Sequence, residues 1–351
     1  MKNLITITLL SLTLFFACQQ KKTEEEQKIN EKISSTFDTT ALKTTPFDAS
    51  EDQSFFLRYK FVSGESFRYR MTTISQNEQS ITTDTSRADH LSQTIIFVMD
   101  FNTLSLDTDS VAELQCMISS VNLKANANGI DITYQSGSAK DSTEKVKFAE
   151  YEAFVNNPFN IRVGKQGEII DIYMIDKIIN RLLDLRGLAD SLSSQEKIMA
   201  KQDLTNKSIK PLLSQIFREV PDHKMATDSA WSYKRESMPV VVFQIDYENV
   251  YTVEKLEMLS NEKLAVINGM VKTKVSGSQT YSEKGINYKF EKPISTAGGK
   301  IYFNLNKGMI QKSRTQTRME NAYKMEMPTP EGLKKASAKE VTSNINVIEL
   351  L

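Results

Sequence analysis

Side chains that could do redox, metal or nucleophilic chemistry are scarce in this sequence. Its 351 residues include two cysteines and two histidines, which are Cys18, Cys116, His90 and His223. The histidines stand far apart and neither lies in a spacing such as His-x-x-x-His, so we expect both at the surface or at strand ends. The sequence also lacks the Gly-x-Ser-x-Gly, P-loop and dinucleotide-binding motifs. We therefore predict no catalytic residues, no metal and no cofactor, and a protein that is not an enzyme.

Two further candidates have simple structural explanations. Cys116 stands between Gln115 and Met117 in an apolar run, where a free thiol behaves as a small hydrophobic side chain. Asp107 and Asp109 could bind Ca²⁺ weakly, but they lack the ligand count and the glycine of a calcium loop. We expect them to form a turn instead.

Cys18 is the one residue for which the sequence predicts a modification. Residues 1–17 have a basic start at Lys2, a short apolar run and Ala17 immediately before the cysteine. This is the anatomy of a secretory signal, and its end resembles a bacterial lipoprotein cleavage box, in which the cysteine is acylated and becomes the first residue. The alternative is a plain signal peptide with an incidental cysteine. Acylation would anchor the protein to a membrane through lipid chains without spanning it.

The residues after Cys18 bear on location. Gln19 in place of aspartate favours delivery to the outer membrane, facing the periplasm. The acidic run at 24–26 resembles the surface-export signals of Bacteroidota lipoproteins, which leaves display at the cell surface open. Residues 18–52 are predicted to be an acylated cysteine followed by a flexible tether, because few large apolar side chains occur there.

The composition supports a folded domain over residues 53–351. Hydrophobic residues make up 40% of the chain, while 44 basic and 44 acidic residues give a formal net charge of zero. A balanced charge provides no general attraction to nucleic acid, so nucleic acid is not expected as a partner.

Alternation of apolar and polar residues predicts mainly antiparallel strands. A hairpin at 158–172, with a turn at Gly164 to Gly167, separates two β-rich halves. A similar strand, glycine turn and strand recur around Gly308, which leaves an internal duplication open. Before the hairpin we expect paired strands at 55–62 and 66–73, at 90–104 and 110–125, and a strand at 130–134. After it we expect strands at 230–233, 240–259, 263–276, 285–291, 299–305, 309–319 and 340–350.

Helical periodicity appears in two places. Residues 143–156 are predicted to form a helix that ends before Pro158. Apolar residues at intervals of three and four from Ile175 to Leu185 predict a second helix, ended near Gly187, and separate helices follow at 194–206 and from 208 to Pro221. The fold class is α+β and mainly antiparallel β, with a large curved sheet or partly closed barrel and a helical arm inserted at about 174–220.

A stripe of apolar residues lies on one face of the predicted sheet and could either fill the core or line a ligand cavity. We expect its members to face the core; they are Phe55, Tyr59, Phe61, Tyr69, Met99 and Phe101. The alternative is that a curved sheet leaves part of this stripe open as an apolar cavity, which the helical arm covers like a lid.

Four segments resemble a family of uncharacterised Bacteroidota lipoproteins, and the likeness runs from Phe55 to Arg318. They start at Tyr59 (Y-K-F-x-x-G-E-x-F-x-Y), Asn157 (N-P-F-N-I-R-V), Pro221 (P-x-x-x-x-x-x-D-S-A-W) and Gly298 (G-G-K-I-Y-F). The resemblance implies a lipid-anchored envelope protein and no reaction. Our leading hypothesis is a non-enzymatic binding or interaction module with an envelope protein as a possible partner. The alternative is a periplasmic carrier of a lipid or other hydrophobic ligand in a half-barrel cavity, with ligand-binding residues unknown.

Overall fold

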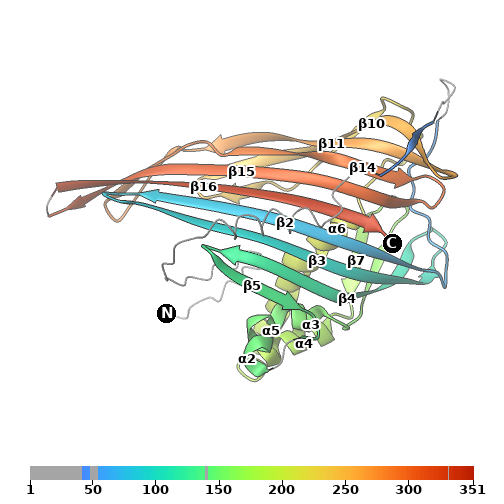
Figure 1. The fold of residues 1–351 in the computed structure, drawn as a ribbon, viewed down its shortest axis with the longest axis horizontal. Helices are drawn as coiled ribbons and strands as arrows, with labels where there is room; N and C mark the ends of the chain where they lie inside the picture. The colour runs from blue at the N-terminus through green and yellow to red at the C-terminus, as the bar shows by residue number, and fades with distance from the viewer. Residues whose placement is uncertain (1–41, 48–53, 139–140, 331) are drawn as a thin grey trace.

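One open, curled antiparallel sheet dominates the computed structural model, which describes residues 42–47, 54–138, 141–330 and 332–351 (Figure 1). The sheet has 16 strands, in the main order β1-β10-β11-β14-β15-β16-β2-β3-β4-β6-β7. This confirms the predicted fold class as a large curved sheet with an inserted helical arm, and the sheet is open. The predicted signal peptide at 1–17, Cys18 and most of the predicted tether lie outside the described residues.

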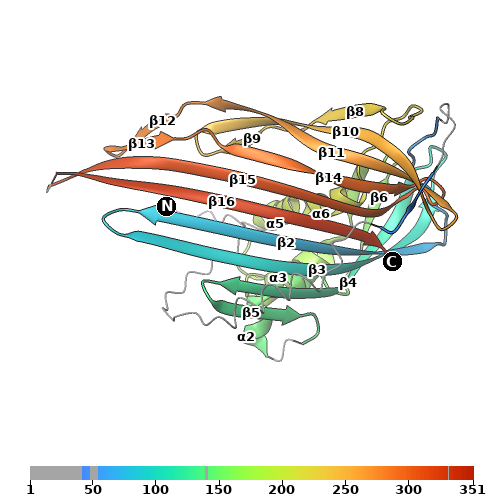
Figure 2. The same ribbon diagram turned by 45° about the horizontal axis from the view of Figure 1, so that its top comes forward.

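The strands are long. Their bounds are β1 Thr45–Pro46, β2 Ser66–Thr82, β3 Ser86–Leu106, β4 Ala112–Ala127, β5 Ile130–Gln135, β6 Phe159–Val163, β7 Ile169–Tyr173, β8 Ala230–Lys234, β9 Met238–Val240, β10 Phe243–Leu259, β11 Glu262–Gly277, β12 Thr280–Glu283, β13 Ile286–Phe290, β14 Ile294–Asn304, β15 Met309–Thr329 and β16 Gly332–Leu350. The last strand, β16, pairs with β2 and so joins the two β-rich halves into one sheet (Figure 2).

The helices gather on one face of the sheet, which we call the inner face (Figure 1). They are α2 Ser142–Lys147, α3 Ala149–Phe154, α4 Asp176–Leu185, α5 Ser194–Leu204, the π-helical turn η1 Thr205–Ile209 and α6 Lys210–Ile216. Alternate strand residues point to this face and join the helices in one core: Tyr69, Phe101 and Ile348 from the sheet, with Leu182 and Phe217 from the arm. The predicted apolar stripe therefore faces the core, although Phe55 is only partly buried.

The arm differs from prediction in two details. Residues 194–216 form one continuous helical run, because a π turn at Thr205–Ile209 lets the Lys210 N–H bond to the Thr205 carbonyl just before Pro211. A wider turn there accommodates a proline that would otherwise break an α-helix. The predicted helix at 143–156 is divided at Phe148 into α2 and α3.

The predicted hairpin of residues 55–62 with 66–73 is wrong. Strand β2 is paired on both edges, with β3 and with β16, so no edge remains for another strand. Residues 55–62, which we call the strap, instead cross the ends of other strands. The Tyr59 N–H donates to the Lys165 carbonyl (2.8 Å) and the Lys60 N–H to the Gly308 carbonyl (3.1 Å). The alternation in the strap is nevertheless correct, because Leu57, Tyr59 and Phe61 are buried.

The end of the predicted tether also belongs to the sheet. Thr45 and Pro46 form β1 and pair with Met258 and Glu257 of β10. Leu42 packs against a small cluster that includes Leu264 and Val266. Residues 42–47 therefore do not belong to the flexible tether that composition predicted. A few apolar side chains are enough to pack this segment against the sheet.

Candidate functional site

A hollow on the inner face lies beside the end of the helical arm, where two glycines of the sheet pair with each other. Its volume is about 180 Å³. Gly269 of β11 pairs directly with Gly299 of β14, and the ring of Tyr251 lies over Gly269. The missing side chain at Gly269 makes room for the Tyr251 ring, and the missing side chain at Gly299 lets the backbone of Arg314 and Thr315 approach closely. It is lined by Arg218, Asn249, Tyr251, Gly269, Met270, Val271, Ala297, Gly298, Gly299, Ile301, Thr315, Gln316 and Thr317.

One buried donor beside this hollow lacks a partner. Arg218 follows α6 and is positioned through its backbone N–H, which donates to Tyr59 Oη at 2.8 Å. Its side-chain Nε is buried and, within the described part of the chain, has no hydrogen-bond partner. Trp231 Nε1 is unpaired as well, but Trp231 does not line the hollow; its ring stacks on Tyr251 with ring centroids 5.2 Å apart. The unpaired donor at Arg218 favours a ligand that brings an oxygen atom.

Hydrogen-bonding side chains continue across the inner face beyond the hollow. Thr315 of β15 pairs with Asn346 of β16, which pairs with Thr73 of β2. The Thr73 hydroxyl donates to Asn346 Oδ1 at 2.9 Å. One step further, the Asn77 amide donates to Glu340 at 2.8 Å. The inner face therefore changes from apolar under the helices to mainly hydroxyl and amide groups where the helices no longer cover it.

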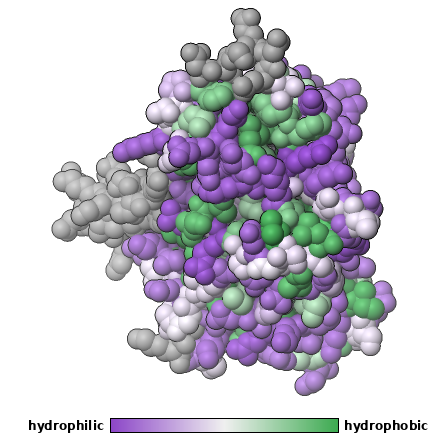
Figure 3. All heavy atoms as spheres, turned by 90° about the vertical axis from the view of Figure 1, so that its right-hand side faces the viewer, coloured by the Kyte–Doolittle hydropathy of each residue, from purple (hydrophilic) through white to green (hydrophobic). Residues whose placement is uncertain are grey.

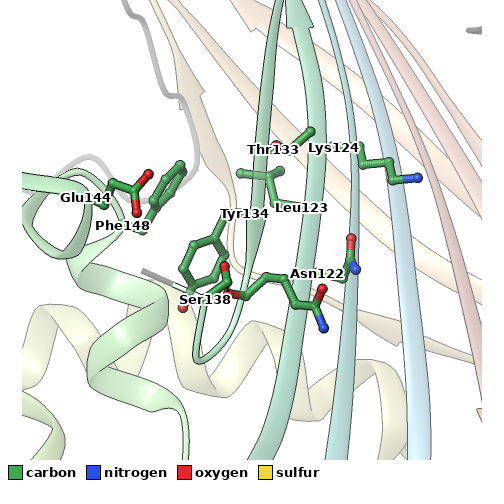
Figure 4. Close-up of a pocket in the computed structure, with 9 residues that line it drawn as sticks. Asn122, Leu123, Lys124, Thr133, Tyr134, Ser138, Glu144 and Phe148 are labelled. Atoms are coloured by element: carbon green, nitrogen blue, oxygen red, sulfur yellow. Dashed lines mark hydrogen bonds between the residues drawn. The ribbon is translucent and has the colours of Figure 1, made fainter. Parts of the chain in front are cut away.

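A second pocket of about 350 Å³ lies between the edge strand β5 and helix α2 (Figure 4). Tyr134 points from β5 toward Phe148, with ring centroids 4.6 Å apart. Its hydroxyl donates to Glu152 Oε1 at 2.7 Å, and burial, aided by this carboxylate, raises the pKa of the Tyr134 phenol. The Tyr134 hydroxyl thus already has a hydrogen-bond partner inside the protein. The pocket is therefore a weaker candidate for ligand binding than the hollow at Arg218.

The residues that the sequence offered for chemistry are not brought together. His90 lies 3.7 Å from Glu78, and His223 lies 3.4 Å from the neighbouring Asp222. Cys116 is fully buried, and burial raises the pKa of its thiol. Across the residues that the structure describes, no group of three or more His, Cys, Asp or Glu side chains could hold a metal ion.

Asp107 performs the turn role expected of it. Its carboxylate accepts hydrogen bonds from the Asp109 and Val111 N–H groups at 3.0 and 2.9 Å. These bonds, with the nearby Arg162 guanidinium, lower the pKa of Asp107. The carboxylate that the sequence offered for calcium is therefore used to hold the turn between β3 and β4.

Arg218 was not predicted as a site residue. It stands near the end of an amphipathic helical pattern, where a basic residue ordinarily stabilises the carboxyl end of a helix. Trp231, the single tryptophan, lies in one of the segments that carried the family resemblance, and its ring supports Tyr251. Only the three-dimensional arrangement places Arg218 beside the paired glycines.

Residues 109–310 match a family described as a family of unknown function (DUF6263). The chain belongs to this family. The match covers more than half of the chain, including β4 to β14 and the whole helical arm. It confirms that the domain is uncharacterised, as the resemblance implied, and assigns no activity to the family.

The solved structures that match this DUF6263 member are distant from it. A structure of lipovitellin, titled for its lipid–protein interactions, matches with 12% identity and a TM-score of 0.38 over 83% of this chain and 25% of the other. The chain thus spans about a quarter of lipovitellin. An outer membrane channel from Pseudomonas putida F1 matches with 5% identity and a TM-score of 0.22, covering 84% of this chain and 97% of the channel.

No curated protein sequence matches the chain. Within the described ranges, none of the helices has the length and apolarity needed to cross a membrane.

Proposed function

We propose that this protein is a non-enzymatic, lipid-anchored protein of the outer membrane that binds a small oxygen-rich ligand in the hollow at Arg218. The anchor rests on the cleavage box that ends at Cys18 and on the resemblance to Bacteroidota lipoproteins. The binding role rests on one observation: the buried donor Arg218 Nε, at a residue that lines the hollow, has no acceptor among the described residues. An unsatisfied buried donor costs about 1–3 kcal/mol, which a ligand oxygen would recover.

The chemistry of the hollow limits the kind of ligand. The Arg218 guanidinium favours a carboxylate or phosphate, and the Thr315 and Thr317 hydroxyls and the Asn249 amide favour further oxygen atoms. An acidic sugar and a phospholipid head group both carry this chemistry. A volume of about 180 Å³ suits a single ring or head group, with the remainder of the molecule outside.

The helical arm weighs against a purely hydrophobic cargo. Phe217 packs its ring 5.6 Å from Phe101 and 5.8 Å from Tyr59, so the apolar part of the inner face is filled by protein side chains. The uncovered part is lined by Thr, Asn, Ser and Gln instead. A lipid would therefore bind through its head group at the hollow rather than through a chain inserted into the core.

Mass measurement of the mature protein tests the anchor. We expect processing at Cys18 and the added mass of acyl chains, and a Cys18→Ser variant should lose both. A mature protein that carries no lipid would contradict the anchoring part of the proposal.

Native mass spectrometry of the purified protein, followed by fragmentation, tests the ligand and distinguishes an acidic sugar from a phospholipid. A hydrogen bond to a charged group contributes about 1.5–3 kcal/mol, so Arg218→Met should weaken binding about tenfold to a hundredfold. Arg235→Met is the matched control, because Arg235 is paired with Glu219 (3.0 Å) and does not line the hollow. Equal occupancy in both variants, or no bound species in the native protein, would contradict the site.

A further inference from the structure

We propose that one end of the curled sheet, where the strap crosses it, rests on the lipid bilayer and orients the protein there. We call this surface the end face. It comprises the outward-facing strap residues Phe56, Arg58, Lys60 and Val62 with the neighbouring Leu104 and Leu351. The proposal rests on the lipid anchor proposed above, and it concerns a surface separate from the hollow.

The strap has two chemically different sides. Its odd-numbered residues from Leu57 to Phe61 are buried, whereas Phe56 and Val62 are 39% and 53% exposed. Between them are two basic residues, of which Lys60 is exposed and Arg58 is half-buried with its Nε enclosed. The Arg58 guanidinium lies 4.1 Å above the Phe56 ring, and Lys60 Nζ donates to the Leu305 and Asn306 carbonyls. The strap thus presents apolar and basic groups together to the outside.

Two residues next to the strap, Leu104 and Leu351, extend this surface. The Gly64 N–H donates to the Thr103 carbonyl at 2.9 Å, which places the strap's last turn beside Leu104, 44% exposed. Leu351, 60% exposed, is held next to β2 by its N–H bond to the Arg68 carbonyl. Viewed toward this end, patches of apolar side chains lie among polar ones (Figure 3).

The chain enters the fold at the same end. Strand β1 pairs with Met258 and Glu257, next to the turn between β10 and β11 (Figure 1). Leu42, the first described residue, lies 24 positions after Cys18. A segment of that length reaches at most about 80 Å, which brings this end to the bilayer but does not by itself fix an orientation. A surface that prefers lipid would fix it.

The composition of the end face suits a lipid surface. Aromatic and aliphatic side chains at the tips of turns can enter the boundary between head groups and acyl chains, while arginine and lysine remain with the anionic head groups. Each basic residue near an anionic surface adds to the attraction between the end face and the membrane. The tip of the β15–β16 hairpin would then point away from the membrane, since it lies at the other end of the sheet (Figure 1).

Depth-dependent fluorescence in the intact acylated protein tests this orientation. Single cysteines at Val62→Cys and Leu104→Cys would carry an environment-sensitive dye in vesicles of phosphatidylethanolamine and phosphatidylglycerol. Leu333→Cys is the control, because Leu333 is 55% exposed and lies at the tip of the β15–β16 hairpin. The buried Cys116 is protected from labelling.

Brominated lipids should quench the dye at positions 62 and 104 at least threefold more than at 333. Quenching at none of the three positions, or equally at all, would overturn the inference. Flotation of the protein with the vesicles tests the anchor separately, and a protein that does not float shows that the anchor proposal has failed. In that case the labelled protein is added to the vesicles from solution. Stronger quenching at positions 62 and 104 than at 333 would still support the end face, whereas no quenching at any position would overturn the inference.

Discussion

Gly167 offers the sharpest test of how the strap is held. It lies in the turn between β6 and β7 with φ of +84°, and a Cβ added there would be 2.5 Å from the Arg218 carbonyl oxygen and 2.6 Å from Cε2 of Tyr59. Gly187, after α4, has a similar φ of +65° but nothing within 4 Å of an added Cβ. The two glycines therefore share the backbone requirement and differ in the contact.

The two alanine variants should separate these costs. A left-handed backbone costs a non-glycine residue about 1–2 kcal/mol, and overpacking adds about 1–3 kcal/mol. We expect Gly167→Ala to lose about 2–5 kcal/mol and Gly187→Ala about 1–2 kcal/mol of unfolding free energy. For a folded part of about 300 residues the corresponding falls in melting temperature are about 3–8 °C and about 2–3 °C.

Calorimetry and urea denaturation of the purified protein measure both variants under one set of conditions. Gly167→Val should be worse than Gly167→Ala, because its branched side chain meets the same backbone. If Gly167→Ala and Gly187→Ala are destabilised equally, the contact with the strap has no energetic weight and the reasoning from the close approach is refuted.

Two further predictions concern titratable groups. Because burial raises the pKa of the Cys116 thiol, a thiol reagent should modify it slowly at pH 8 in the native protein and rapidly in denaturant; rapid labelling of the native state would contradict the buried position. The hydrogen bond from the Val111 N–H, foremost among several contacts, lowers the pKa of Asp107. The ionised Asp107 carboxylate therefore stabilises the folded protein fully at a pH above the ordinary aspartate pKa of about 3.9. This stabilisation is lost as the pH falls through the lower pKa of Asp107 in the folded state. Asp107→Asn should show a smaller fall in melting temperature between pH 5 and pH 3 than the parent protein, whereas Asp109→Asn, which keeps these hydrogen bonds, should follow the parent.

Strand prediction succeeded where the inner side chains are apolar. Met99 and Phe101 flank the polar Asp100 in β3, and Leu114 and Cys116 flank Gln115 in β4, so their period of two indicated strands facing a core. The same strands continue well beyond that pattern. Strand β2 extends to Thr82 and β3 begins at Ser86, in polar sequence that gives no alternation of hydrophobicity because both faces are polar there.

The candidate site could not be predicted from the sequence for a related reason. Hydrophobic alternation identifies which residues face inward, but it does not tell which inward positions the helices leave uncovered. Gly269 and Gly299 are 30 positions apart and meet only because β11 and β14 pair in a particular register. A shift of one residue in either strand would turn its glycine away from the inner face. The hollow is thus a consequence of strand register, which local sequence does not specify.

The strap explains why two similar hairpins recur in the chain. The turn containing Gly167 and the turn containing Gly308 both contact it: the first through Tyr59, and the second through Arg58 and Lys60. Each glycine has a positive φ, and each would bring a Cβ within 3 Å of strap atoms. A common function at the strap accounts for the likeness of the two hairpins without a duplication. It also makes the strap the element that connects strands distant in the sheet, because β6–β7 lies at one edge while β14–β15 lies toward the middle. Loosening either turn should therefore disturb the end face and the position of Arg218 together, since Gly167 touches the Arg218 backbone as well as Tyr59.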